Sequence, residues 1–125
     1  MAINFIRIAL VYAIIGIGIG IYMAASHSFL QRDTHAHANL LGWVSLALSG
    51  LIYQVLPALG NHVLAKAHFW LHNLGLPVTI VGIALLYDGN PTVGEPLAGI
   101  GSSVVALGFL ALLINVFRTP LSDQV

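Results

Sequence analysis

Residues 3–25 read INFIRIALVYAIIGIGIGIYMAA, a mostly apolar run whose one charged side chain is Arg7. A helix needs about 20 mostly apolar residues to cross a bilayer, and this run has that length. It is also longer than the apolar core of about 7–15 residues that a secretory signal peptide carries. We therefore expect residues 3–25 to form a membrane-spanning helix and not a cleaved signal.

The composition of the 125-residue chain points the same way. Hydrophobic residues make up 58% and charged residues 6% of the chain. Soluble domains typically contain about 45–50% apolar residues and about 25% charged residues. So few charges cannot cover a soluble globule, and so high a hydrophobicity excludes disorder. The basic and acidic residues cancel, so no nucleic-acid partner is expected. The lack of cysteine excludes disulfides, iron–sulfur clusters and covalent haem attachment.

Three further stretches have the length and hydropathy of spanning helices, at about 35–56, 65–86 and 97–117. The connections between them are too short to hold a soluble domain. We therefore expect residues 1–125 to form one all-α integral membrane domain of four transmembrane helices, in contact with the lipid bilayer. Asp33 or Thr34 is expected to cap the second helix.

The basic residues predict how the chain crosses the membrane. With the N-terminus in the cytoplasm, Arg7, Lys66 and Arg118 lie inside and Arg32 lies outside. This excess of inner positive charge follows the positive-inside rule. The expected topology is N-in/C-in, and the expected location is a bacterial inner (cytoplasmic) membrane.

Small residues mark possible contact faces of the helices. Gly16 and Gly20 form a G-x-x-x-G motif in the first stretch. The fourth stretch contains Gly99, Ser102, Ser103 and Gly108. Such residues let membrane helices approach closely, either inside one bundle or between copies. Because four helices leave nearly every helix exposed to lipid, a homo-oligomer is also expected.

Six histidines stand out in this apolar chain, because an imidazole inside a membrane is costly and usually functional. By predicted depth they form two groups. The outer group is His27, His35 and His37, and the inner group is His62, His68 and His72. His35 and His37 are two residues apart, so their side chains leave a helix about 200° apart. They cannot easily hold one ion together, but each can serve a site on its own side of the helix.

His68 and His72 are four residues apart and therefore share one helix face, a spacing that suits zinc or copper. Two ligands do not complete a metal site, and no Asp, Glu or Cys lies nearby in the sequence. The alternative is a structural role, in which the rings bond backbone groups freed by Pro77 or a polar side chain such as Gln54. His62 is expected to be a solvated loop residue.

Haem held by two histidines needs both imidazoles at one depth. Counting residues along the helices separates His37 and His72 by about 20 Å in depth, which excludes that pair. His27 could lie at the right depth, in a loop or a last helical turn. The motif at His35 and His37 fits a different arrangement, in which each ring points to a neighbouring copy and one haem lies at each interface.

Three motifs carry a family resemblance: THAHANLLGW at Thr34–Trp43, YQVLP at Tyr53–Pro57 and HFWLHNLGLP at His68–Pro77. Over most of residues 22–118 the chain resembles small membrane proteins labelled cytochrome oxidase subunit I-like. More distantly it resembles the first four helices of the haem–copper oxidase catalytic subunit. That subunit arranges twelve helices in three arcs of four, so the resemblance implies that one copy is one third of an oxidase-like ring and that three copies complete it.

Matched residue by residue, His35 and His37 correspond to the oxidase His-x-His motif, and either could match the lone axial histidine of its second helix. The resemblance implies haem b, with His35 and His37 of adjacent copies as iron ligands in a homotrimer. His68 and His72 match no oxidase ligand. The chain also lacks an adjacent histidine pair, a His-x-x-x-Tyr pair and a cysteine copper centre, so oxygen reduction by this chain alone is not expected.

Three residues near the motif are candidate haem contacts. Arg32 could pair with a haem propionate, since guanidinium groups bind carboxylates through two hydrogen bonds; the alternative is a solvated pair with Asp33. Asn39 and Trp43 could orient a histidine ring or pack on the macrocycle, and ordinary helix packing is their alternative.

The sequence thus predicts a membrane b-type haem protein for electron transfer, or for binding or sensing a diatomic gas such as NO or O2. Relatives of this region occur in proteins linked to the nitric oxide response. Two other functions stay open: a copper- or zinc-binding membrane protein, including a metal-ion transporter, and a cofactor-free assembly subunit of an oxidase complex.

Overall fold

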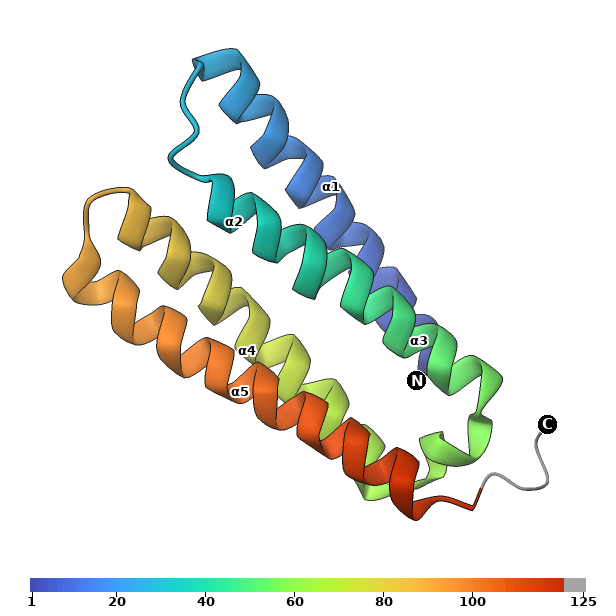
Figure 1. Cartoon of the computed structure of the whole chain (residues 1–125). Helices are drawn as coiled ribbons and strands as arrows, with labels where there is room; N and C mark the ends of the chain where they lie inside the picture. The colour runs from blue at the N-terminus through green and yellow to red at the C-terminus, as the bar shows by residue number, and fades with distance from the viewer. Residues whose placement is uncertain (121–125) are drawn as a thin grey trace.

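The computed structural model describes residues 1–120, and the regular secondary structure within them is all helical (Figure 1). In chain order the helices are α1 (Ala2–Ser26), α2 (Arg32–His37), the π-helix η1 (Ala38–Val44), α3 (Ser45–Val55), the 3-10 helix η2 (Pro57–Asn61), α4 (Val63–Tyr87) and α5 (Pro91–Arg118). The segments α2, η1 and α3 run on as one rod, because the residues at their junctions, Ala38 and Ser45, keep helical dihedral angles.

The four predicted spans are confirmed. Within residues 1–120, the helices long and apolar enough to cross a membrane are Ala2–Ser26, Arg32–Val55, Val63–Tyr87 and Pro91–Arg118. The fourth begins six residues earlier than predicted, because Pro91 takes the first helical position, where its missing N–H costs nothing. Pro96 and Pro77 lie inside helices without ending them.

The predicted cap of the second helix is wrong. The helix begins at Arg32, so Asp33 and Thr34 already lie in its first turn, and Gln31 takes the cap position. The Thr34 hydroxyl donates to Gln31 Oε1 at 2.6 Å and caps no backbone N–H.

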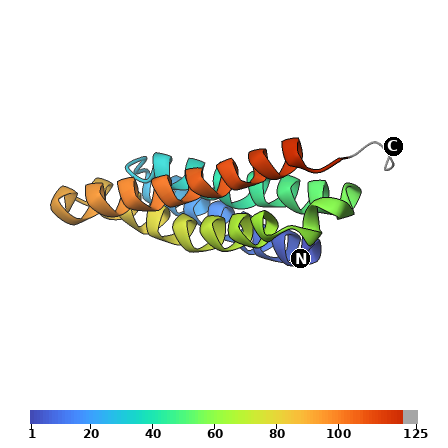
Figure 2. The same cartoon turned by 90° about the horizontal axis from the view of Figure 1, so that it is seen from below.

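The helices form two antiparallel hairpins, α1 with the α2–α3 rod and α4 with α5 (Figures 1 and 2). One end of the bundle carries Met1, the 56–62 connection and Arg118, and we call it the proximal end. The other carries the 27–31 and 88–90 connections, and we call it the distal end.

Glycines let the α4–α5 hairpin pack backbone against backbone. A Cβ atom on Gly82 would lie 2.2 Å from the Ala98 nitrogen, and one on Gly101 would lie 2.4 Å from the Thr79 nitrogen. Of the small residues noted in the fourth span, Gly108 faces α4. The others, Gly99, Ser102 and Ser103, are exposed.

The G-x-x-x-G motif of α1 faces the chain's own rod. A Cβ on Gly16 would lie 2.5 Å from Asn39 Nδ2, and one on Gly20 would lie 3.0 Å from His35 Cε1. Of the two readings left open, packing within the bundle is the one observed. The two glycines therefore leave room for Asn39 and His35, two of the candidate haem-site residues.

An aromatic cluster joins the two hairpins in the proximal half. The Phe5 ring of α1 lies 5.5 Å from the Tyr53 ring of α3, and 5.1 and 5.0 Å from the His68 and Phe69 rings of α4. Nearby, Asn115 Nδ2 of α5 donates to the carbonyl oxygen of Leu59 in η2 at 2.9 Å. The outer faces are apolar; Phe117, for example, is 83% exposed, which is consistent with lipid contact.

Candidate functional site

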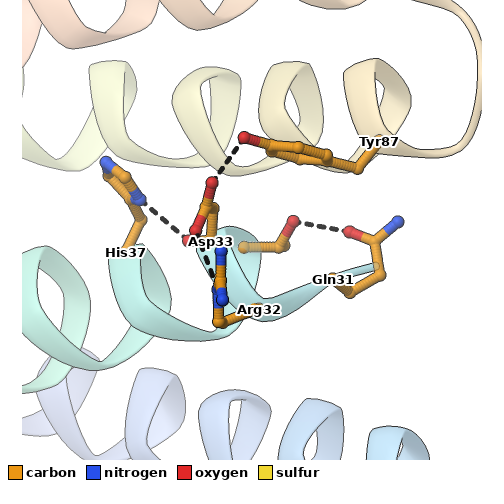
Figure 3. Close-up of polar contacts among 6 residues, drawn as sticks. Gln31, Arg32, Asp33, His37 and Tyr87 are labelled. Atoms are coloured by element: carbon orange, nitrogen blue, oxygen red, sulfur yellow. Dashed lines mark hydrogen bonds and ion pairs between the residues drawn. The ribbon is translucent and has the colours of Figure 1, made fainter. Parts of the chain in front are cut away.

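A polar network ties the start of α2 to the end of α4 at the distal end (Figure 3). The Tyr87 hydroxyl donates to Asp33 Oδ2, and Gln31 Nε2 donates to the Ala84 carbonyl oxygen at 3.2 Å. Arg32 Nε lies 3.7 Å from Asp33 Oδ1, and the Arg32 side chain is 81% exposed. This network fixes the first turn of the rod, where the candidate histidines begin.

His35 is held against α1. Its Nδ1 lies 2.8 Å from the carbonyl oxygen of Gly16. A carbonyl oxygen only accepts hydrogen bonds, so Nδ1 of His35 carries the proton and Nε2 carries the lone pair. Asn39 Nδ2 donates to the His35 carbonyl oxygen at 2.8 Å and lies 3.4 Å from His35 Nδ1. The ring is therefore held by the Gly16 carbonyl oxygen of α1, while Asn39 bonds the backbone of His35.

His37 is held in the same tautomer by a different group. Its Nδ1 donates to the carbonyl oxygen of Asp33, one turn earlier, at 2.8 Å. In Figure 3 the ring lies on the side of α2 that faces α4, where Asp33 and Tyr87 meet. Nε2 of His37 is again the nitrogen with the lone pair.

The two rings point to opposite sides of the rod, as the two-residue spacing predicts. His35 contacts α1, and His37 lies on the α4 side. Both residues belong to α2 and precede the π-helical turn, so the geometry of a regular helix applies to them. They are not brought together on a common ion within one chain.

The neighbouring candidates separate into different roles. Asn39 contacts His35 and packs on Gly16. Trp43 is 43% exposed on the outside of η1. Arg32 is paired with Asp33 and largely solvent-exposed, which is the alternative that the sequence left open for it.

A groove of about 460 Å³ between α1 and α4 lies near these residues. Its lining is apolar apart from Gln31, Thr34 and the Tyr22 hydroxyl. Neither His35 nor His37 lines it, so this groove does not supply a slot for a ligand of those rings.

His68 and His72 are fully buried between the hairpins. The Tyr53 hydroxyl lies 3.0 Å from His68 Nδ1, and His72 Nε2 donates to the Leu41 carbonyl oxygen at 3.0 Å. The partners predicted from sequence, Gln54 and the backbone freed by Pro77, are therefore not the ones used. Tyr53 was visible in the YQVLP motif, but no local pattern identified its partner.

The predicted depth gap of about 20 Å between His37 and His72 is too large. His72 bonds Leu41, which lies four residues after His37, or about 6 Å along a helix axis. The predicted gap was obtained by counting residues from the inner ends of the two helices, as if those ends lay at the same depth. In the structure α4 begins at Val63, so His72 lies nine residues beyond its first residue. The pair stays unsuitable for one haem, because His72 Nε2 is already bonded to Leu41.

The remaining histidines lie at helix ends. His27 is exposed and ends α1 in the left-handed conformation, with φ of 52°. His62 is exposed, as predicted, and its Nδ1 also accepts the Leu64 backbone N–H at 3.2 Å at the start of α4. Within residues 1–120, no group of three or more His, Cys, Asp or Glu side chains could hold a metal ion.

Comparison of the chain with known protein families, with curated proteins and with solved structures finds no match. The geometry above is therefore the basis on which a function is assigned.

Proposed function

We propose that this protein is an integral membrane b-type haem protein, with haem held between adjacent copies by His35 of one copy and His37 of the next. The observation that carries the proposal is the shared tautomer of the two rings. Each donates Nδ1–H to a backbone carbonyl oxygen at 2.8 Å. Each therefore has its Nε2 lone pair available as an iron ligand.

This arrangement is typical of histidines that bind metals. The nitrogen that does not bind the metal almost always donates to a carbonyl, carboxylate or water, which fixes the ring and makes it a stronger ligand. In this chain the Gly16 and Asp33 carbonyl oxygens accept that hydrogen bond from His35 and His37. Both rings are partly buried, so their orientation is held by packing as well.

The two rings face different helices of their own chain, α1 for His35 and α4 for His37, so each would serve a separate haem. His35 and His37 differ in depth by about 3 Å, two helical residues, and leave opposite sides of the rod. One copy can therefore contribute to two haems at almost the same depth, one on each side. A closed ring of such contacts is a cyclic oligomer, and we propose a homotrimer because three four-helix copies complete a ring of twelve helices.

Three residues would complete the site. Arg32, with an 81% exposed side chain, would pair with a haem propionate at the membrane surface. Asn39 positions His35 through its contacts with that residue. Trp43 presents an exposed indole on η1 that can pack on the macrocycle or on a neighbouring copy.

The bound haem would supply one-electron redox chemistry and, where a position on the iron is open, binding of NO or O2. Two histidine ligands on one iron would leave no position for a gas, which favours electron transfer over gas binding. The location that we propose is a bacterial inner membrane, where the redox partner would also lie.

An optical spectrum of the purified protein tests the proposal. We expect a Soret band and sharp α and β bands after reduction with dithionite. His35→Ala and His37→Ala should each abolish the low-spin spectrum. His27→Ala, at the same end of the bundle and exposed, should leave it unchanged. A protein that stays without visible absorption after haem-supplemented expression contradicts the proposal.

Mixing the two variants tests whether the ligands come from different copies. A heterologous interface needs His35 from one copy and His37 from the other, so equal co-expression of the two variants should restore about a quarter of the sites. Ligands from a single chain would give no restoration, because every chain in the mixture lacks one of them.

A further inference from the structure

The buried pair of His68 and His72 is a second candidate site, separate from the proposed haem ligands. Their ring centres lie 5.7 Å apart. Nε2 of His68 and Nδ1 of His72 are covered by protein and have no hydrogen-bond partner. Buried polar atoms are nearly always paired in proteins, so two such atoms on adjacent rings indicate a missing partner.

The other nitrogen of each ring is already held. His68 Nδ1 lies 3.0 Å from the Tyr53 hydroxyl, and His72 Nε2 donates to the Leu41 carbonyl oxygen at 3.0 Å. Nδ1 of His72 therefore carries a lone pair. As with His35 and His37, such support from a hydroxyl or carbonyl is what orients histidines that bind a metal.

The number of ligands and the burial of His68 and His72 limit which metal ion the pair can bind. Nitrogen ligands bind metals at about 2.0 Å, and ring centres 5.7 Å apart are close enough for one ion to lie within reach of both rings. No third His, Cys, Asp or Glu joins the pair in the described chain, so a tetrahedral zinc site is not formed. Burial among aromatic rings, with Phe5 at 5.1 Å from the His68 ring and Phe109 at 5.0 Å from the His72 ring, penalises a divalent ion more than a monovalent one.

We propose that His68 Nε2 and His72 Nδ1 bind one soft monovalent metal ion of the Cu(I) class, which is stable with two nitrogen ligands. Tyr53 and the Leu41 carbonyl oxygen are the positioning groups. With Nε2 on the metal, His68 Nδ1 carries the proton and donates it in a hydrogen bond to the Tyr53 oxygen. The site lies in the core, apart from His35 and His37, so it does not depend on the haem proposal.

The test uses the full chain with its other histidines replaced by glutamine. These replacements are His27→Gln, His35→Gln, His37→Gln and His62→Gln. The protein is incubated with Cu(I) kept reduced by ascorbate, desalted and analysed for copper, and its ¹⁵N-labelled imidazoles are followed by NMR. We expect one copper per chain and shifted signals for His68 Nε2 and His72 Nδ1. His68→Gln or His72→Gln should weaken binding at least tenfold.

A variant that retains both ligands guards against loss of folding. Tyr53→Phe removes only the positioning hydroxyl and should weaken copper binding by about 10–100-fold. Tyr12→Phe, on α1, is the matched control and should bind as the parent does. Circular dichroism shows whether each variant keeps its helices. Unshifted nitrogen signals, or equal copper in parent and His68→Gln protein, would overturn the proposal.

Discussion

His35 donates its Nδ1–H to the carbonyl oxygen of Gly16 at 2.8 Å, across the contact between α1 and the rod. The glycine leaves room for the Asn39 amide, because a Cβ at position 16 would lie 2.5 Å from Asn39 Nδ2 and 2.7 Å from its Cγ. The amide of Asn39 in turn bonds the His35 backbone. A glycine on one helix thus sets the orientation of a histidine on the next.

Gly16→Ala should therefore displace Asn39 and His35. Overpacking of this kind costs about 1–3 kcal/mol, and we expect the low-spin haem spectrum to weaken with it. Thermal unfolding and haem content check both effects. Gly18→Ala is the matched control, since a Cβ there meets no atom within 4 Å; equal behaviour of the two variants would refute the assigned contact.

Gly82→Ala should separate α4 from α5. The added Cβ would meet the Ala98 backbone 2.2 Å away, and backbone cannot move aside as a flexible side chain can. We expect a loss of at least about 2 kcal/mol in the free energy of unfolding, measured by denaturation in detergent. Gly99→Ala, on an exposed face of α5 with nothing within 4 Å, should be neutral or slightly stabilising because alanine favours helix.

Asn115→Leu should loosen the proximal end. It removes the donor to the Leu59 carbonyl oxygen and leaves that buried acceptor without its partner, which costs about 1–3 kcal/mol. Denaturation in detergent measures this loss in the free energy of unfolding. Ser103→Ala removes an exposed bond within α5, from the Ser103 hydroxyl to the Gly99 carbonyl oxygen, and should change stability by less than about 0.5 kcal/mol.

Asp33→Asn tests whether the carboxylate of Asp33 helps to orient His37, the proposed iron ligand. His37 bonds the backbone oxygen of Asp33, not its carboxylate, so the haem spectrum should be unchanged. The contacts of the carboxylate with Tyr87 and Arg32 are exposed and screened by solvent, so their loss should leave the stability almost unchanged. Loss of haem in this variant would show that the carboxylate, and not the backbone, orients the ring.

The four spans were predictable because a bilayer fixes the length and composition of any helix that crosses it. The start of the fourth span was not, because the polar residues before Leu97 hide a helix that begins at Pro91. The depth of His72 was misjudged for a related reason. Counting from helix ends cannot tell how two helices are offset along their axes.

Local hydropathy predicts an all-helical chain of four apolar spans, and the turn of a helix predicts the opposite directions of His35 and His37. His37 bonds Asp33 one turn earlier in its own helix, but the tertiary structure is what brings His35 Nδ1 to the Gly16 carbonyl oxygen. It also decided that Tyr53 meets His68 and that Leu41 meets His72. Those contacts join residues 15 and 31 positions apart, and they depend on the offset between helices packed through glycine and aromatic side chains, which no local pattern encodes.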